Sequence, residues 1–208
     1  MINLMMKKIK LTEVKEKYGV GFGGSGIRAL IDDLTDEVVY VYALGFLKYI
    51  GNYKRVAIAG DLRESTPRLM RVICKAIKDC GMEVVNCGCI PTPAVAFYGI
   101  KNQIPSVMIT GSHIPADRNG IKFYKAEGEI LKPDKAAIAE MVVEYDTNIF
   151  QSELPEINIE AKNMYIERYN NYFSKNCLDK MNIGLYGHSA VGRDILAQIL
   201  ENFGAKVT

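Results

Sequence analysis

The sequence lacks an excess of charge of either sign, long apolar runs and a cysteine framework, and each absence excludes a class of protein. Its 26 Lys and Arg against 24 Asp and Glu leave a net charge of +2, so neither nucleic acid nor an acidic membrane is predicted as a partner. No run approaches the roughly 18 apolar residues of a membrane span. The N-terminus has no apolar signal region followed by a small-residue cleavage site, so we expect a cytoplasmic protein.

The cysteines follow neither a disulfide nor a zinc spacing. They are Cys74, Cys80, Cys87, Cys89 and Cys177. An odd number without a CxxC pair argues against a disulfide framework, and Cys87-Gly88-Cys89 lacks a second pair of metal ligands. Reduced thiols in or near the core of a cytosolic protein are therefore predicted.

Strand-like and helix-like segments alternate along the chain. Apolar runs at 55–60, 82–88 and 106–110 have strand length. Helical spacing and capping signals predict helices at 36–50, 66–80, 93–100, 135–148 and 164–176. The first helix has several possible caps, and Thr66 is expected to cap the second, with Pro67 at its first position. This alternation predicts an α/β sheet with parallel pairs and helices on its faces.

The last third of the chain differs in composition and periodicity from the rest. Residues 146–160 are polar, broken by Pro155 and without a clear period, which indicates a linker or a boundary. "NIGLYGH" then leads through a loop into a helix ending "ENFGAKVT", in the same order as "VAIAGD" and "KDCGMEVV". This repeat is either a coincidence or a sign of two related domains. A lone strand with one or two helices cannot bury the faces of a sheet. Either it joins the first sheet or the chain is part of a longer protein, which we favour.

Candidate chemistry follows the strand at 106–110. In open α/β sheets, ligand-binding groups lie where strands end, and Gly111 permits a close approach of backbone N–H groups to an anion. Ser112 is then either a turn serine or a phosphate-handling hydroxyl. His113 is its neighbour, but adjacent side chains of an extended segment point to opposite sides, so contact between them is not expected. A Ser–His hydrolase is disfavoured, since no G-x-S-x-G elbow is present.

Two more features follow this loop. Asn119-Gly120 indicates a turn. Lys122 lies in a short alternating strand and points away from the face of Ile121 and Phe123. It is either a solvated lysine or, if its face looks toward Ser112, part of a phosphoryl-transfer centre.

A Gly-rich loop, "GVGFGGSGIRAL" at 19–30, offers backbone amides, Ser25 and Arg28 to a phosphate. It formally matches a dinucleotide fingerprint, but no predicted strand precedes it, and it is not a P-loop. Asp61 and Arg63 follow the strand at 55–60, as a structural ion pair or as site residues.

Taken in order along the chain, these motifs resemble the α-D-phosphohexomutase superfamily, which comprises phosphomannomutases and phosphoglucomutases. "FGGSGIRAL" is similar to the family's FGTSGIRG loop. "TGSHIPADRNGIKFY" is similar to its phosphoserine loop, T-[AG]-S-H-N-P followed by N-G-x-K. The resemblance implies a three-layer α/β/α domain with a mixed, largely parallel sheet. Residues 1–150 would form the first domain, with the phosphoserine loop, and 151–208 the linker and incomplete start of a similar second domain.

The resemblance also implies roles for single residues. Ser112 would carry the phosphoryl group as phosphoserine and contribute to a metal site, and Lys122 would be a general acid/base. Arg28 and His113 would contact the phosphoryl group. Ser25, Arg63 and Asn119 would be weaker phosphate or substrate contacts that shape the site.

The implied reaction moves a phosphoryl group between O1 and O6 of a hexose phosphate through a bisphosphorylated sugar. Mg²⁺ would be bound by the serine phosphate and an aspartate-rich loop of a third domain, and a hexose bisphosphate would act as activator. Cations beside Ser112 fit this chemistry, because a phosphoserine carries a charge of about −1.5 to −2.

Some features depart from the family pattern. Ile114 replaces the usual Asn of S-H-N-P, Gly24 stands where Thr is common, and Ala29 where Gly is. The metal, sugar-specificity and C-terminal phosphate loops have no counterpart in the sequence, so these 208 residues alone are expected to lack appreciable mutase turnover. A phosphoglucosamine mutase, or a noncatalytic sugar-phosphate-binding module, remains the alternative.

Overall fold

The computed structural model describes residues 5–24, 26–148 and 150–208. Within these residues the helices are α1 (Leu11–Tyr18), α2 (Asp36–Ile50), α3 (Thr66–Asp79), α4 (Thr92–Asn102), α5 (Lys132–Ala139), α6 (Glu160–Asn170) and α7 (Arg193–Asn202). The strands are β1 (Met6–Lys10), β2 (Gly26–Leu30), β3 (Arg55–Gly60), β4 (Glu83–Cys89), β5 (Ser106–Ile109), β6 (Arg118–Lys125), β7 (Gly128–Glu129), β8 (Val142–Asp146), β9 (Asn182–Ile183) and β10 (Lys206–Val207).

The central sheet has the strand order β2-β6-β5-β3-β4, with the short β7 beside β6. Strand β3 is parallel to both β4 and β5, and helices α3 and α4 form the crossovers between these strands. Strand β6 is antiparallel to β2, β5 and β7. The predicted α/β class with a mixed sheet is confirmed.

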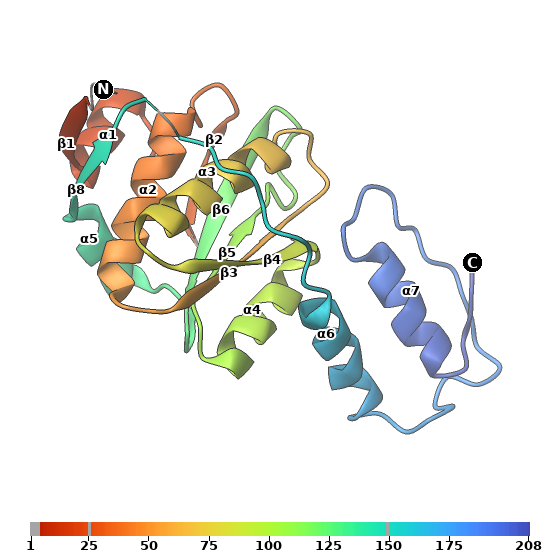
Figure 1. Cartoon of the computed structure of the whole chain (residues 1–208). Helices are drawn as coiled ribbons and strands as arrows, with labels where there is room; N and C mark the ends of the chain where they lie inside the picture. Colours follow the sequence, from red (N-terminus) through yellow and green to blue (C-terminus); the bar gives the residue numbers. More distant parts are fainter. Residues whose placement is uncertain (1–4, 25, 149) are drawn as a thin grey trace.

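Helices cover both faces of this sheet (Figure 1). Helices α2 and α3 pack on one face, over Ile58 and Phe123, and α4 packs on the other, over Met108 and Tyr124. Phe123 is fully buried, and its ring lies 4.8 Å from that of Phe46 on α2. Because side chains alternate along β6, Lys122 lies on the α4 face of the sheet, together with Tyr124.

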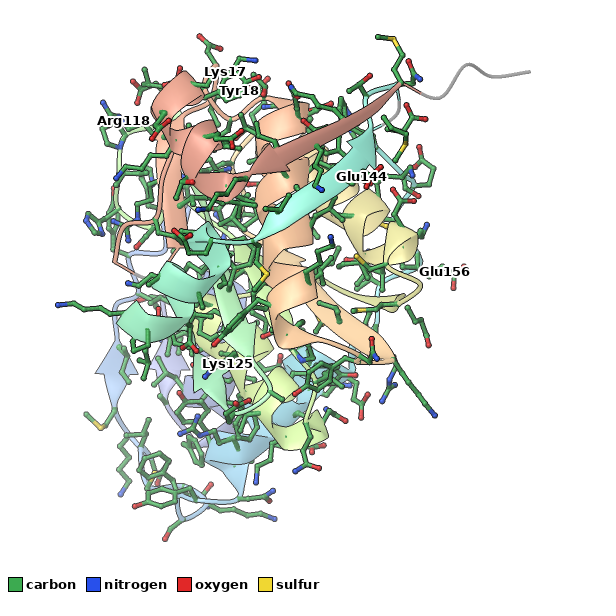
Figure 2. All side chains as sticks on the ribbon, turned by 90° about the vertical axis from the view of Figure 1, so that its left-hand side faces the viewer. Lys17, Tyr18, Arg118, Lys125, Glu144 and Glu156 are labelled. Carbon is green, nitrogen blue, oxygen red and sulfur yellow. The ribbon has the colours of Figure 1, made fainter. Side chains whose placement is uncertain are left out.

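The predicted helix at 135–148 is wrong in its second half. Helix α5 ends at Ala139, and 142–146 form strand β8, which pairs antiparallel with β1. Figure 2 shows β1 and β8 side by side in front of α2. Val143 and Tyr145 alternate with exposed residues and are buried, and this period of two decides for a strand.

The other helix boundaries agree with the local signals to different degrees. Thr35 is the cap of α2, its hydroxyl accepting a hydrogen bond from the Val38 N–H, and Gly51 ends that helix. In α3 the cap position belongs to Ser65, so the prediction for Thr66 is wrong by one residue. The predicted helix at 164–176 lies earlier, at 160–170.

The last third of the chain contacts the first part at several points. The extended segment after Phe150 bonds across the domain: Ser152 N–H donates to the Arg71 carbonyl at 3.1 Å and Asn158 N–H to the Asn86 carbonyl at 2.7 Å. The predicted linker is therefore bound to the first part of the chain, and we call residues 151–158 the strap. Strands β9 and β10 form their own two-stranded parallel sheet and do not join the central one.

Buried residues of α6 and α7 belong to the same apolar cluster as α4 and β4. They include Ala161, Ile166, Ile195 and Ile199. The predicted boundary near residue 150 therefore separates two stretches of sequence that share a core.

The cysteines are unpaired, in agreement with the absence of a framework. Cys74 and Cys87 are buried, and burial raises the pKa of the Cys87 thiol to about 12. Cys89 and Cys177 are exposed, so the expectation of near-core thiols fails for these two. Within the described part of the chain, no helix has both the length and the apolar character to span a membrane.

Glu37 at the start of α2 joins three elements and gives the fold a pH dependence. Burial raises the pKa of its carboxyl, but hydrogen bonds from Lys7, Tyr145 and Tyr18 outweigh burial, so the pKa is lowered overall. Its stabilising effect is present above the unfolded value of about 4.3 and is lost as the pH falls through the lower folded pKa.

We expect Glu37→Gln to reduce the free energy of unfolding at pH 7, with the difference from the unmodified protein shrinking below about pH 4.3. Urea unfolding at a series of pH values measures this. Glu144→Gln, on the exposed side of β8, is the control and should change stability little at any pH. A Glu37→Gln deficit that stayed constant down to pH 3 would contradict the assignment.

Candidate active site

Ser112 lies just beyond the end of β5 with its side chain exposed. Its φ is +53°, a left-handed conformation that L-residues other than Asn and Asp rarely adopt. The hydroxyl of Thr110 accepts the Ser112 N–H at 2.9 Å and helps to fix this turn. The serine thus lies beyond the carboxyl end of a sheet strand, where ligand-binding groups of α/β proteins are found.

The imidazole of His113 contacts the Ser112 hydroxyl, with Oγ and Nδ1 3.3 Å apart. The expectation that these neighbours would not meet is wrong. It assumed an extended backbone, whereas the left-handed turn at Ser112 brings the two side chains to one side. A ring nitrogen at this position can donate to an anion on the serine.

Two cations lie on the α4 face of the sheet beside this loop. Arg28 on β2 pairs with Gly120 on β6, and Lys122 pairs with Gly26. Because both partners are glycines, the two long side chains have room on the same face. A Cβ added at Gly120 would lie 3.0 Å from Arg28 Cγ, so the Arg28 side chain lies over this glycine.

Neither cation is neutralised locally. Across residues 5–24, 26–148 and 150–208, no carboxylate lies within ion-pair distance of Arg28 or Lys122. Arg28 is exposed and Lys122 is half-buried. Lys122 also lies opposite Met108 in the β5–β6 register. Both cations are available to an added negative charge.

Arg63 is turned toward the protein. Its guanidinium donates to backbone carbonyls of the 112–118 loop, and its Nε lies 3.4 Å from Asp61 Oδ2. Asp61 in turn accepts the Gly111 N–H at 3.0 Å and the Thr66 hydroxyl at 2.7 Å. The predicted contact of Arg63 with a phosphate would require these bonds to be released.

Asn119 is buried, and the predicted turn at Asn119-Gly120 is wrong because both residues lie within β6. The Asn119 amide donates to the hydroxyls of Ser65 at 2.9 Å and Thr66 at 3.1 Å. Gly120 is required by close packing, since a Cβ there would lie 2.8 Å from the Ile27 carbonyl oxygen. Asn119 thus fixes the start of α3 to the central sheet.

The Gly-rich loop leads into β2 and follows helix α1, and Ser25 lies outside the described residues. Gly23 N–H donates to the Gly26 carbonyl at 2.7 Å. Lys135 of α5 donates to the carbonyls of Gly23 and Gly24 and so holds the loop against α5. Sequence reasoning missed Lys135, because nothing local distinguishes it from other helical lysines.

A cleft of about 740 Å³ opens beside Ser112. One wall carries Thr110, Ser112 and His113, and the other is residues 189–192, the loop before α7. In Figure 1 this loop faces the central sheet. The volume lies within the range of small-molecule sites, about 300–1,000 Å³.

The metal predicted for Ser112 finds few other ligands nearby. Over the described residues, no group of three or more His, Cys, Asp and Glu side chains could hold an ion. The carboxylate of Asp61 is already engaged with Gly111, Arg63 and Thr66. These residues alone therefore do not fit a complete magnesium site.

The chain is similar to known proteins in sequence and in fold. Residues 19–149 match the model for phosphoglucomutase/phosphomannomutase, alpha/beta/alpha domain I. The chain is 41% identical to a phosphomannomutase of Sinorhizobium fredii over 91% of its own length and 42% of the relative's. It is 38% identical to a phosphomannomutase of Salmonella muenchen, over 97% and 43%. A phosphoglucosamine mutase of Dictyoglomus turgidum is 35% identical over 73% and 35%.

A crystal structure of a phosphoglucomutase/phosphomannomutase family protein from Burkholderia thailandensis shares the fold, with a TM-score of 0.71 and 20% identity. It matches over 88% of this chain and 42% of that one. The chain thus spans about two fifths of the length of the curated phosphomannomutases it matches. From the domain I match and these identities, the chain belongs to the phosphoglucomutase/phosphomannomutase family.

Proposed function

We propose that the protein containing this chain is a phosphohexomutase in which Ser112 carries the transferred phosphoryl group. One observation carries the proposal: an exposed serine hydroxyl, held in a left-handed turn, opens on a 740 Å³ cleft beside an imidazole, and Arg28 and Lys122 lie on the α4 face of the adjoining strands. Phosphoryl transfer depends mainly on positioning and charge neutralisation, and this arrangement supplies both.

In the proposed step, a sugar hydroxyl oxygen forms a new bond to phosphorus while the bond from phosphorus to Ser112 Oγ breaks. The hydroxyl proton passes to the departing Oγ, and Lys122 is the proposed acid/base that carries it. Arg28 and His113 offset the negative charge on the phosphoryl oxygens. The reverse step, from the other end of a bisphosphorylated sugar, returns a phosphoryl group to Ser112.

A magnesium ion, if bound, would neutralise phosphoryl charge as a Lewis acid. Its predicted ligand in this chain is the phosphate on Ser112. The described side chains offer no cluster of three or more ligands to complete the site.

The substrate class is a hexose phosphate, with mannose phosphate favoured by the two phosphomannomutase relatives. Several phosphoglucosamine mutases are also 31–38% identical to this chain, which keeps an aminosugar phosphate as the second candidate. Competition between the two sugar phosphates in the experiment below ranks them.

The test is phosphoryl transfer from a hexose 1,6-bisphosphate to the protein that contains this chain, followed by intact-mass analysis. We expect a species heavier by about 80 Da, absent from Ser112→Ala. Ser189→Ala is the matched control, because Ser189 lies in the same cleft and contacts its own neighbouring histidine, His188, at 2.8 Å. If that protein without substitution failed to gain mass, or if Ser112→Ala were labelled equally, the proposal would be rejected and a noncatalytic sugar-phosphate-binding protein favoured.

A further inference from the structure

Four backbone carbonyls of the loop that carries Ser112 converge on one guanidinium group. Arg63 Nη1 donates to the Pro115 carbonyl at 2.7 Å and the Arg118 carbonyl at 3.0 Å. Nη2 donates to the Ile114 carbonyl at 2.6 Å and the Ser112 carbonyl at 3.3 Å. The loop is therefore wrapped around the side chain of a residue that follows a different strand.

The remaining N–H of Arg63 is also occupied. A guanidinium has five N–H groups, and the four on the Nη atoms match the four carbonyls. The fifth, on Nε, faces Asp61 Oδ2 at 3.4 Å. Gly111 lies against the guanidinium so closely that a Cβ there would be 2.2 Å from Nε. The Arg63 side chain is only 17% exposed, and its charge is balanced by Asp61.

We propose that Arg63 is a positioning residue: it holds the Ser112 loop in its left-handed turn and does not bind the transferred phosphoryl group. What this role contributes to catalysis rests on the proposed function, whereas the placing of the loop by Arg63 can be tested without it. The positive charge offered to the phosphoryl group then comes from Arg28 and Lys122, whose donors have no carboxylate partner among the described residues.

Physical reasons favour an arginine in this place. A non-glycine residue at φ +53° is strained and persists only where its surroundings over-determine it. Hydrogen bonds from a charged donor are about twice as strong as neutral ones, and four of them act on one short loop. Lysine has only three donors on a single nitrogen and cannot span carbonyls on both sides of the loop, so Arg63→Lys is not a conservative change.

The first test is hydrogen exchange of the unphosphorylated chain, which requires no phosphoryl transfer. In Arg63→Lys, we expect amides of 111–118 to exchange about tenfold faster or more, with the core strands unchanged. Arg68→Lys is the control: Arg68 also pairs with a carboxylate, Asp36, and its guanidinium donates to the carbonyls of Leu34 and Ile31 rather than to those of the Ser112 loop. Unchanged exchange at 111–118 would overturn the proposal.

The second test separates positioning from general stability. Ser112→Cys places a thiol at the loop tip, and the pH dependence of its alkylation reports how closely it faces the neighbouring cations. Adding Arg63→Lys should move the pH midpoint of alkylation toward about 8.5, the ordinary pKa of a cysteine thiol. Adding Arg68→Lys should leave this midpoint unchanged. An equal midpoint in all three proteins would show that Arg63 does not place residue 112. Either outcome is independent of whether the serine accepts phosphate.

Discussion

Gly26→Ala is expected to destabilise the protein more than any other alanine substitution in the Gly-rich loop. A Cβ at this position would lie 1.9 Å from the Ile121 carbonyl oxygen and 2.8 Å from its carbon. These are backbone atoms in the middle of β6, so relief requires β2 to separate from its partner. We expect a loss of about 3 kcal/mol or more in the free energy of unfolding, measured by urea denaturation.

Gly24→Ala provides the matched control for this substitution. A Cβ at Gly24 would meet nothing within 4 Å, and its φ lies outside the left-handed range. We expect its stability to change by no more than about 0.5 kcal/mol. If the two variants unfolded at the same urea concentration, the close pairing of β2 with β6 would be contradicted.

Lys122→Ala is expected to slow phosphoryl transfer to Ser112 by about 10²- to 10⁴-fold, the usual contribution of a general acid or base. The rate of mass gain from hexose 1,6-bisphosphate in a single turnover measures it. Lys125→Ala is the control on the same strand: Lys125 points to the opposite face and pairs with Asp134 at 3.1 Å. Its transfer rate should stay within a few-fold of the unmodified protein.

Lys122→Arg distinguishes proton transfer from simple charge. Arginine keeps the positive charge but does not release its proton near neutral pH. If Lys122 carries the proton, the arginine variant should be nearly as slow as the alanine variant. A rate close to that of the unmodified protein would contradict the acid/base role and leave Lys122 as an electrostatic contact.

Local signals in the sequence predicted much of the fold. The buried strands β3, β4 and β5 read as apolar runs, because each is covered on both faces by helices. Helix α2 was predicted with its bounds, since Gly51 ends it in a conformation that favours glycine. Strand β8 was not predicted, because its partner β1 lies near the start of the chain and no local pattern indicates the pairing.

Part of the candidate site was likewise predicted from local sequence, and part depends on contacts between residues far apart in the chain. Ser112 and Lys122 were predicted from one contiguous motif; Ser112 lies just beyond β5, and Lys122 lies within β6, opposite Met108 of β5. The partners of Arg63 and Asn119 could not be predicted, because they lie about fifty positions away in sequence. The contact of Ser112 with His113 depends on one backbone angle, and a serine carries no sequence signal for a positive φ.

The shared apolar cluster of α4, α6 and α7 bears on how the two walls of the cleft meet. If a flexible linker joined the two walls, the length of the linker would set how often they meet, as an effective concentration. Here the far wall is set by close packing and by a strap bonded to Arg71 and Asn86. Lengthening the strap would then change the width of the opening less than a smaller side chain at Ile195 or Ile199 would.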